Sequence, residues 1–159
     1  MRDCPVWAEI KDRFEPDGSL RDVYVLKTNR SDWEKFIAFV RSSPVAPVMR
    51  RDDQPIPVEL PSDFPHFPED AIRPRLEFVI AGLECRCHFF GDEEIEFDIN
   101  PAEMKGEHEY EALVSFLGRL RDVMNRDVVL TEENCNPDRE YWHLPEAVIL
   151  RLAANRGSI

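Results

Sequence analysis

A dense run of carboxylates is the part of this chain that could do chemistry most directly. Between residues 92 and 111 the sequence places nine aspartates and glutamates against one lysine, Lys105. Such a run can create a negative field that attracts and orients a basic protein. A run of like charges is more commonly just a solvated surface, and that interpretation stays open beside docking. The residues predicted to contact a basic partner are Asp92, Glu93, Glu94, Glu103, Glu107, Glu109 and Glu111.

Clustered carboxylates could instead bind a divalent cation or form an acid and base pair in a hydrolytic domain. The candidates for this alternative are Glu94, Glu96, Asp98 and His88. Arginines are expected on the neighbouring strands, across from these acids, where they would keep the carboxylates ionised and paired. The pattern therefore favours a ladder of cross-strand charge pairs, and the run also lacks the spacing and central glycine of an EF-hand loop.

The cysteines offer two further chemistries. Cys85, Cys87 and His88 suggest zinc, but alternation along a strand places both thiols on one face and the histidine on the other, so the three cannot close one tetrahedron. Cys135 with His143 is the best nucleophile and base pair, although no cationic residue lies near Cys135 in sequence to lower its pKa. The chain contains no nucleophile elbow, phosphate-binding loop or dinucleotide fingerprint, and no cofactor is predicted.

These residues are positioned by a predicted three-stranded antiparallel meander over residues 76–99. A two-residue turn at Ala81-Gly82 and a loop at 91–93 align its two faces. In this register Glu77 lies opposite Arg86, Arg86 opposite Asp98, Arg75 opposite His88, and His88 opposite Glu96, so charges of opposite sign meet. The other face is apolar and carries Leu76, Phe78, Ile80, Leu83, Cys85, Cys87, Phe89, Ile95, Phe97 and Ile99.

Two helices are predicted to cover the apolar face. One spans about residues 31–42, where Ser31 and Glu34 form a capping box and apolar residues recur at helical spacing. The other spans about 107–125, with an acidic first turn and a basic last turn, as the helix dipole prefers.

The remaining segments have weaker signals. Residues 6–14 and 21–28 resemble strands joined by Glu15-Pro16-Asp17-Gly18, which predicts an N-terminal hairpin. Residues 44–74 carry eight of the 13 prolines and are expected to be irregular, serving as a lid or packed across the sheet by Phe64 and Phe67. A short strand is expected over 127–131. The segment 147–154 fits a strand or a helix, and helix is slightly favoured.

Composition limits the class of protein. With 159 residues, 43% hydrophobic residues and 33% charged residues, the chain is predicted to form one α+β domain over 1–159. The net charge of −12, with no basic stripe, argues against nucleic acid or an anionic membrane surface as partner. The four cysteines form no CxxC pair, and the charged N-terminal sequence does not resemble a secretory signal, so a cytoplasmic location is expected.

The resulting prediction is a non-enzymatic acidic protein that binds a basic protein, as an inhibitor, immunity protein or adaptor does. The metal-binding or hydrolytic domain described above is the alternative. The chain could be a monomer or a homodimer. An interface between copies would use an exposed sheet edge or an aromatic patch formed by Phe64, Phe67, Tyr141 and Trp142.

Overall fold

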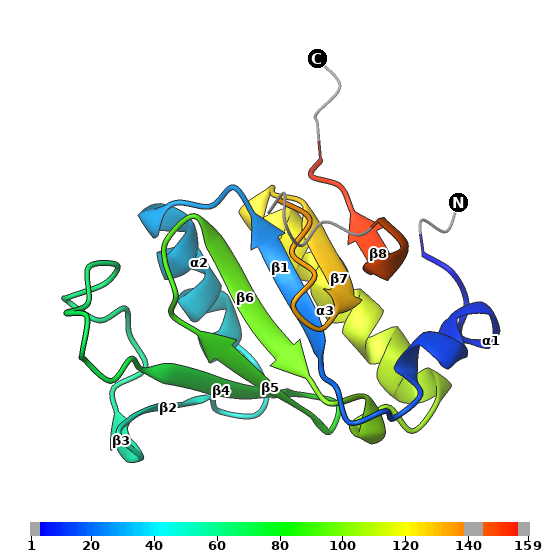
Figure 1. The fold of residues 1–159 in the computed structure, drawn as a ribbon, viewed down its shortest axis with the longest axis horizontal. Helices are drawn as coiled ribbons and strands as arrows, with labels where there is room; N and C mark the ends of the chain where they lie inside the picture. Colours follow the sequence, from blue (N-terminus) through cyan, green and yellow to red (C-terminus); the bar gives the residue numbers. More distant parts are fainter. Residues whose placement is uncertain (1–3, 139–144, 156–159) are drawn as a thin grey trace.

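The computed structural model describes residues 4–138 and 145–155 and contains one eight-stranded sheet (Figure 1). Every pair of neighbouring strands is antiparallel, in the order β3-β2-β4-β5-β6-β1-β7-β8. Helices α2 (Arg30–Arg41) and α3 (Glu107–Met124) lie on one face, where they cover the main hydrophobic core. The predicted α+β class with an antiparallel sheet and two main helices is confirmed.

The central meander has the predicted register. It consists of β4 (Arg75–Ile80), β5 (Leu83–His88) and β6 (Glu94–Ile99). All four predicted charge pairings across these strands are present, and side chains alternate between the buried core and the opposite face. Ala81 and Gly82 form the connecting turn with φ values of 47° and 86°. The period-two pattern and the cross-strand charges together were sufficient to specify this region.

Both predicted helices are confirmed, with a difference at the start of α2. Its N-cap is Asn29, whose side chain accepts from the Asp32 N–H while the Asp32 carboxylate accepts from the Asn29 N–H. The capping box therefore uses these two residues instead of Ser31 and Glu34, and the helix begins one residue earlier than predicted.

The predicted N-terminal hairpin is wrong. The first half is helical, with α1 (Trp7–Ile10) followed by the 3-10 helix η1 (Lys11–Phe14). Trp7 and Phe14 pack on Tyr110 of α3, with ring centroids 5.7 and 6.0 Å apart respectively. The second half, β1 (Arg21–Leu26), pairs with β6 and β7 (Val128–Glu132), so it lies inside the sheet. Contacts with distant segments thus override the local turn signal at residues 15–18.

The proline-rich segment is less irregular than predicted. Strands β2 (Val48–Arg51) and β3 (Gln54–Ile56) form a hairpin that extends the sheet beyond β4. After β3 the chain has no helix or strand until Arg75. Phe64 anchors this part: it is 3% exposed, and its ring lies 4.9 Å from that of Trp33. The expectation that aromatic residues pack this segment against the molecule is confirmed.

The C-terminal segment forms a strand and not the slightly favoured helix. After the 3-10 turn η4 (Pro145–Ala147), β8 (Val148–Leu152) pairs with β7 and makes one edge of the sheet. A short apolar run fits either structure by periodicity alone, and here the open edge of β7 provides the pairing partner.

The strand expected at 127–131 is confirmed as β7. Another short 3-10 helix, η2 (Pro101–Glu103), precedes α3. None of the described helices has the length and apolar character needed to cross a membrane.

Candidate functional site

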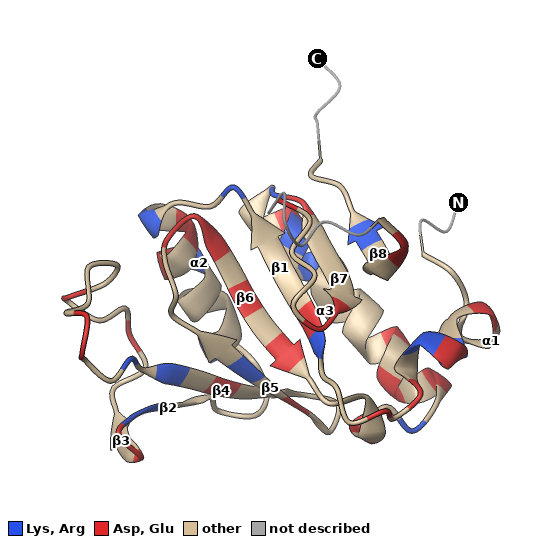
Figure 2. Ribbon diagram, in the orientation of Figure 1, with Lys and Arg blue, Asp and Glu red and all other residues tan. Residues whose placement is uncertain are grey.

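The sheet face opposite the two helices carries most of the charged candidates. Cations lie on β2, β4 and β5, and carboxylates lie along β6, so the two signs occupy neighbouring regions of this face (Figure 2). One cross-strand row shows the change of sign, running from Arg50 through Arg75 and His88 to Glu96 and Tyr24. This face of the sheet, which we call the open face, therefore has a basic half and an acidic half.

A loop covers the β1 end of this face. The chain that follows β7 crosses in front of β1 (Figure 1), and the Asn134 N–H donates to Oδ2 of Asp22 over 2.8 Å. Farther along the loop, the Asn136 side chain donates to the carboxylate of Glu94 on β6. Two carboxylates of the sheet thus hold the loop against it. Tyr24, Leu26 and Val129 form a small buried cluster, with Val148 packed against it.

Asp22 and Asp98 form a pair of buried carboxylates that the sequence analysis did not identify. They are direct partners across β1 and β6 and are 3% and 6% exposed. Asp98 has basic neighbours: its Oδ2 is 2.7 Å from Nε2 of His88, and its Oδ1 is 3.9 Å from Nη1 of Arg86. Burial raises the pKa of Asp22, and the Asn134 N–H and Tyr24 hydroxyl oppose that rise only in part. The pairing of β1 with β6 was the missing information, because Asp22 was assigned to a hairpin elsewhere.

Of the four candidates for a metal or hydrolytic site, His88 and Asp98 lie in contact with each other. Glu94 binds Asn136, whereas Asp98 binds His88. Cys85 and Cys87 are buried on the helix side, where burial raises both thiol pKa values well above their ordinary range, and His88 lies on the open face, as predicted. In the described part of the chain, no group of three or more histidine, cysteine, aspartate or glutamate side chains is arranged to hold a metal ion.

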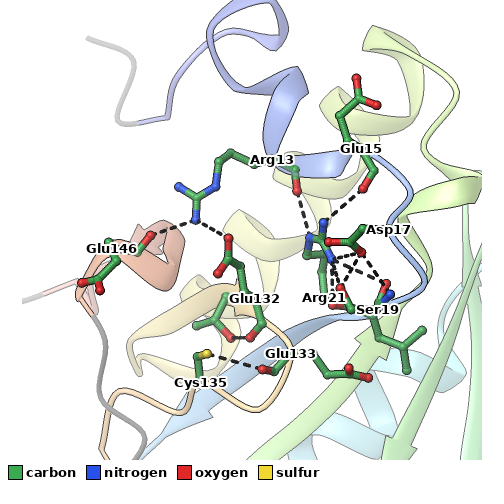
Figure 3. Close-up of polar contacts among 11 residues, drawn as sticks. Arg13, Glu15, Asp17, Ser19, Arg21, Glu132, Glu133, Cys135 and Glu146 are labelled. Atoms are coloured by element: carbon green, nitrogen blue, oxygen red, sulfur yellow. Dashed lines mark hydrogen bonds and ion pairs between the residues drawn. The ribbon is translucent and has the colours of Figure 1, made fainter.

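Cys135 lies close to acidic groups (Figure 3). Its Sγ donates to the Glu133 carbonyl over 3.4 Å, and burial together with Glu132, Asp22 and Glu146 raises the thiol pKa. A raised pKa keeps the thiol protonated and weakens it as a nucleophile. The proposed base, His143, lies outside the described residues, as do Tyr141 and Trp142 of the suggested interface between copies.

The same view shows two arginines, Arg13 and Arg21, that connect segments around Cys135. Arg13 of η1 reaches the Glu132 carboxylate at 3.4 Å and the Glu146 carbonyl at 3.0 Å, so it joins the N-terminal helices to β7 and η4 (Figure 3). Arg21 is buried and donates to the carbonyl oxygens of Arg13 and Glu15. Both arginines therefore link segments of the fold to one another.

The acidic residues predicted to bind a partner fall into two groups at opposite ends of β6. Asp92, Glu93 and Glu94 lie where β6 begins. Beyond the end of β6, Glu103 lies in η2, where its Oε1 accepts from the Glu84 N–H over 3.2 Å. The rest of this second group lies in the first turns of α3 and consists of Glu107, Glu109 and Glu111.

The first group lines a large hollow, which we call the acidic groove. It measures about 910 Å³ and is lined by Asp92, Glu93, Glu94 and by Asp138 from the loop after β7. Lys27 contributes a cationic side chain to its wall, and Phe90, which is 52% exposed, contributes an aromatic ring. The remaining wall is formed by Thr28, Pro65, His66 and Gly91.

The acidic groove is held in place by backbone contacts. The Thr28 N–H donates to the Glu93 carbonyl over 3.0 Å, and its hydroxyl donates to the Asp92 carbonyl over 2.6 Å. These bonds tie the loop between β5 and β6 to the end of β1. Asp138 could not have been assigned to this group from the sequence, because it lies more than forty residues beyond Glu94 in the chain. Comparisons of the chain with models of known protein families, with curated proteins and with solved structures found no match.

Proposed function

We propose that this protein acts by binding a basic protein through the acidic groove, in the manner of an inhibitor, immunity protein or adaptor, and that it does so in the cytoplasm. The observation that carries the proposal is the convergence of Asp92, Glu93, Glu94 and Asp138 on one hollow. These carboxylates come from two segments that are distant in sequence. A concave wall with one dominant sign of charge concentrates the field and attracts groups of the opposite sign.

Two features of the groove support binding beyond long-range attraction. Phe90 provides an exposed aromatic ring at its wall, and aromatic side chains are common anchors in protein interfaces. The two hydrogen bonds from Thr28 hold the loop backbone in one conformation, which reduces the entropy that binding would cost. A lysine or arginine of the partner is the group that best fits this combination.

The metal-binding or hydrolytic alternative has weaker support. Two of its four candidates, Asp98 and His88, bind each other, and Arg86 also lies near Asp98. Glu94 binds Asn136 instead. The negative charge of −12 is consistent with either function and does not separate them. The grouping of carboxylates in the groove is therefore the better basis for the proposal.

Two charge-reversal variants of equal size test the groove. The first is Asp92→Lys with Glu93→Lys and Asp138→Lys, and the second is Glu107→Lys with Glu109→Lys and Glu111→Lys. Glu94 is left unchanged because it binds Asn136. Both variants change the net charge by the same amount, so general electrostatic attraction weakens equally. Each protein is used to capture partners from native lysate at low and then high salt, and binding of an oligolysine peptide and of any captured protein is measured by titration.

We expect the groove variant to lose affinity by about tenfold or more, while the helix variant keeps most of it. Partner release should increase with salt, because exposed charge pairs are screened. Equal loss in both variants would show that net charge alone attracts the probe. Retained affinity in the groove variant would exclude the groove as the docking site.

A further inference from the structure

A second hollow lies on the other side of Phe90, and it is rich in arginine. It measures about 350 Å³, and its wall includes Arg50, Arg73, Arg75 and His88. Asp52 and Asp53 of the β2–β3 turn also line it, so three guanidinium groups face two carboxylates there. This balance contrasts with the chain as a whole, which has 32 acidic residues and 20 lysines and arginines. We call this site the arginine hollow.

The sheet register forces the basic groups of this hollow together. Arg50 lies directly opposite Arg75, and Arg75 lies directly opposite His88, so three adjacent strands present basic side chains in one row. Like charges in direct cross-strand positions destabilise a sheet. Glu77 relieves part of the repulsion, since its Oε1 is 3.6 Å from Arg50 and 2.9 Å from Arg75. One carboxylate is thus shared between two guanidinium groups.

Arg73 adds a third guanidinium at a defined position. Its Nη1 donates to the Phe90 carbonyl over 3.2 Å, and its side chain also lies over the ring of Phe67. An arginine carries five N–H donors in a planar fork, so the bonds to Phe90 and to Glu77 leave further donors on Arg73 and Arg75. Such forks match the oxygen atoms of a carboxylate or a phosphate.

The wall of the arginine hollow is also partly apolar. Ile72 and Phe90 are 56% and 52% exposed, unusually high values for large hydrophobic side chains in this molecule. The Phe90 ring stacks on the His88 ring at a centroid distance of 5.4 Å, which holds it beside the basic row. A hollow of this size is in the lower range of small-molecule sites, and such sites combine apolar walls with a few polar groups that fix orientation.

We propose that the arginine hollow binds a small ligand whose oxyanion, a carboxylate or a phosphate, is attached to a flat apolar group. The oxyanion contacts Arg73, Arg75 and Arg50, and the apolar group rests on Phe90 and Ile72. This site goes beyond the docking function proposed above, because it selects the opposite charge through Arg50, Arg73 and Arg75, which line the arginine hollow and not the acidic groove, although the two hollows share Phe90. Either proposal can therefore fail without the other.

Isothermal titration with three matched probes tests the assignment. Phenyl phosphate and benzoate carry the two candidate oxyanions on an aromatic ring, and benzyl alcohol carries the ring without the charge. Arg73→Gln, Arg75→Gln and Arg50→Gln remove one guanidinium each, and Arg41→Gln at the exposed end of α2 removes the same charge away from the hollow. Thermal unfolding of each variant verifies that it is folded.

We expect phenyl phosphate or benzoate to bind, benzyl alcohol not to bind, and the hollow variants to weaken binding at least about tenfold relative to Arg41→Gln. The tighter of the two anionic probes identifies the head group as phosphate or carboxylate. Absence of binding by both anions, or equal binding by all folded variants, would overturn the proposal.

Discussion

Asp22 is a carboxylate residue that is only 3% exposed. It lies beneath the loop that follows β7 and directly opposite a second carboxylate, Asp98. Burial, rather than a single repulsive contact, is the main cause of its raised pKa. A carboxyl group with a raised pKa holds its proton more tightly in the folded chain than in the unfolded chain. Its contribution to stability is therefore greatest at low pH and is lost as the pH rises from about 3.8 through the raised value.

Replacing Asp22 with asparagine should remove that loss. The amide oxygen can still accept from the Asn134 N–H, and the amide N–H groups can donate toward Asp98. We expect Asp22→Asn to have a higher free energy of unfolding than the parent at pH 7, with the difference shrinking towards pH 4. Urea unfolding across this range measures it.

Asp17→Asn provides a control of opposite sign. Hydrogen bonds from Ser19 lower the pKa of Asp17 to about 2, so its ionised form is favoured by folding. The parent should lose that stability as the pH falls through this value, and the asparagine variant should not be stabilised at pH 7. If the free energies of unfolding of the parent and of Asp22→Asn changed in parallel with pH, the raised pKa of Asp22 would be contradicted.

At the scale of elements, the turn between β4 and β5 carries a residue poorly suited to its backbone. Both turn positions have positive φ, 47° at Ala81 and 86° at Gly82, which is the requirement of a type I′ hairpin turn. Alanine pays a steric cost in this region, whereas asparagine tolerates it. The turn connects β4 and β5, whose register is set by several charge pairs. The pairing of these strands therefore holds Ala81 in this unfavourable backbone conformation.

Ala81→Asn should raise the free energy of unfolding by roughly 1 kcal/mol, because it relieves the left-handed backbone at this position. Gly82→Ala should lower it by a similar amount, again roughly 1 kcal/mol. A Cβ at residue 82 would meet no atom within 4 Å, so the effect is purely conformational. Urea unfolding measures both changes. If Gly82→Ala left the free energy of unfolding unchanged, the turn would not be held in this conformation.

At the scale of the whole molecule, charge is distributed unevenly. The acidic groove and the arginine hollow share Phe90 as a common wall, so surfaces of opposite sign meet along one side of the sheet. The formal net charge of −12 nevertheless means that repulsion between carboxylates opposes the compact state at neutral pH.

Salt should therefore stabilise the protein at neutral pH. We expect the Tm at pH 7 to rise by a few degrees between low and moderate sodium chloride, since screening weakens the repulsion. The rise should be much smaller near pH 4.8, the isoelectric point, where the net charge vanishes. Scanning calorimetry at both pH values measures it, and a fall in Tm with salt at pH 7 would show that attractive ion pairs dominate.

The sequence by itself determined the elements whose signals are local. The meander predicted over 76–99 and helices α2 and α3 follow from alternation, helical spacing and charges that match only in one register. Burial of an apolar face makes a slip of one residue very costly, which is why such a pattern specifies its register so strongly. The opposite faces of Cys85 and His88 followed directly from the same alternation.

Only the tertiary structure decided which distant segments meet. The N-terminal segment is helical because Trp7 and Phe14 pack on Tyr110, and β8 is a strand because β7 offers an edge. Pairing of β1 with β6 brought Asp22 to Asp98, and the loop after β7 brought Asp138 to the acidic groove. Short apolar runs fit several structures equally well in isolation. Their structure, and the sites they build, are set by nonlocal pairing and burial, which depend on residues far away in the chain.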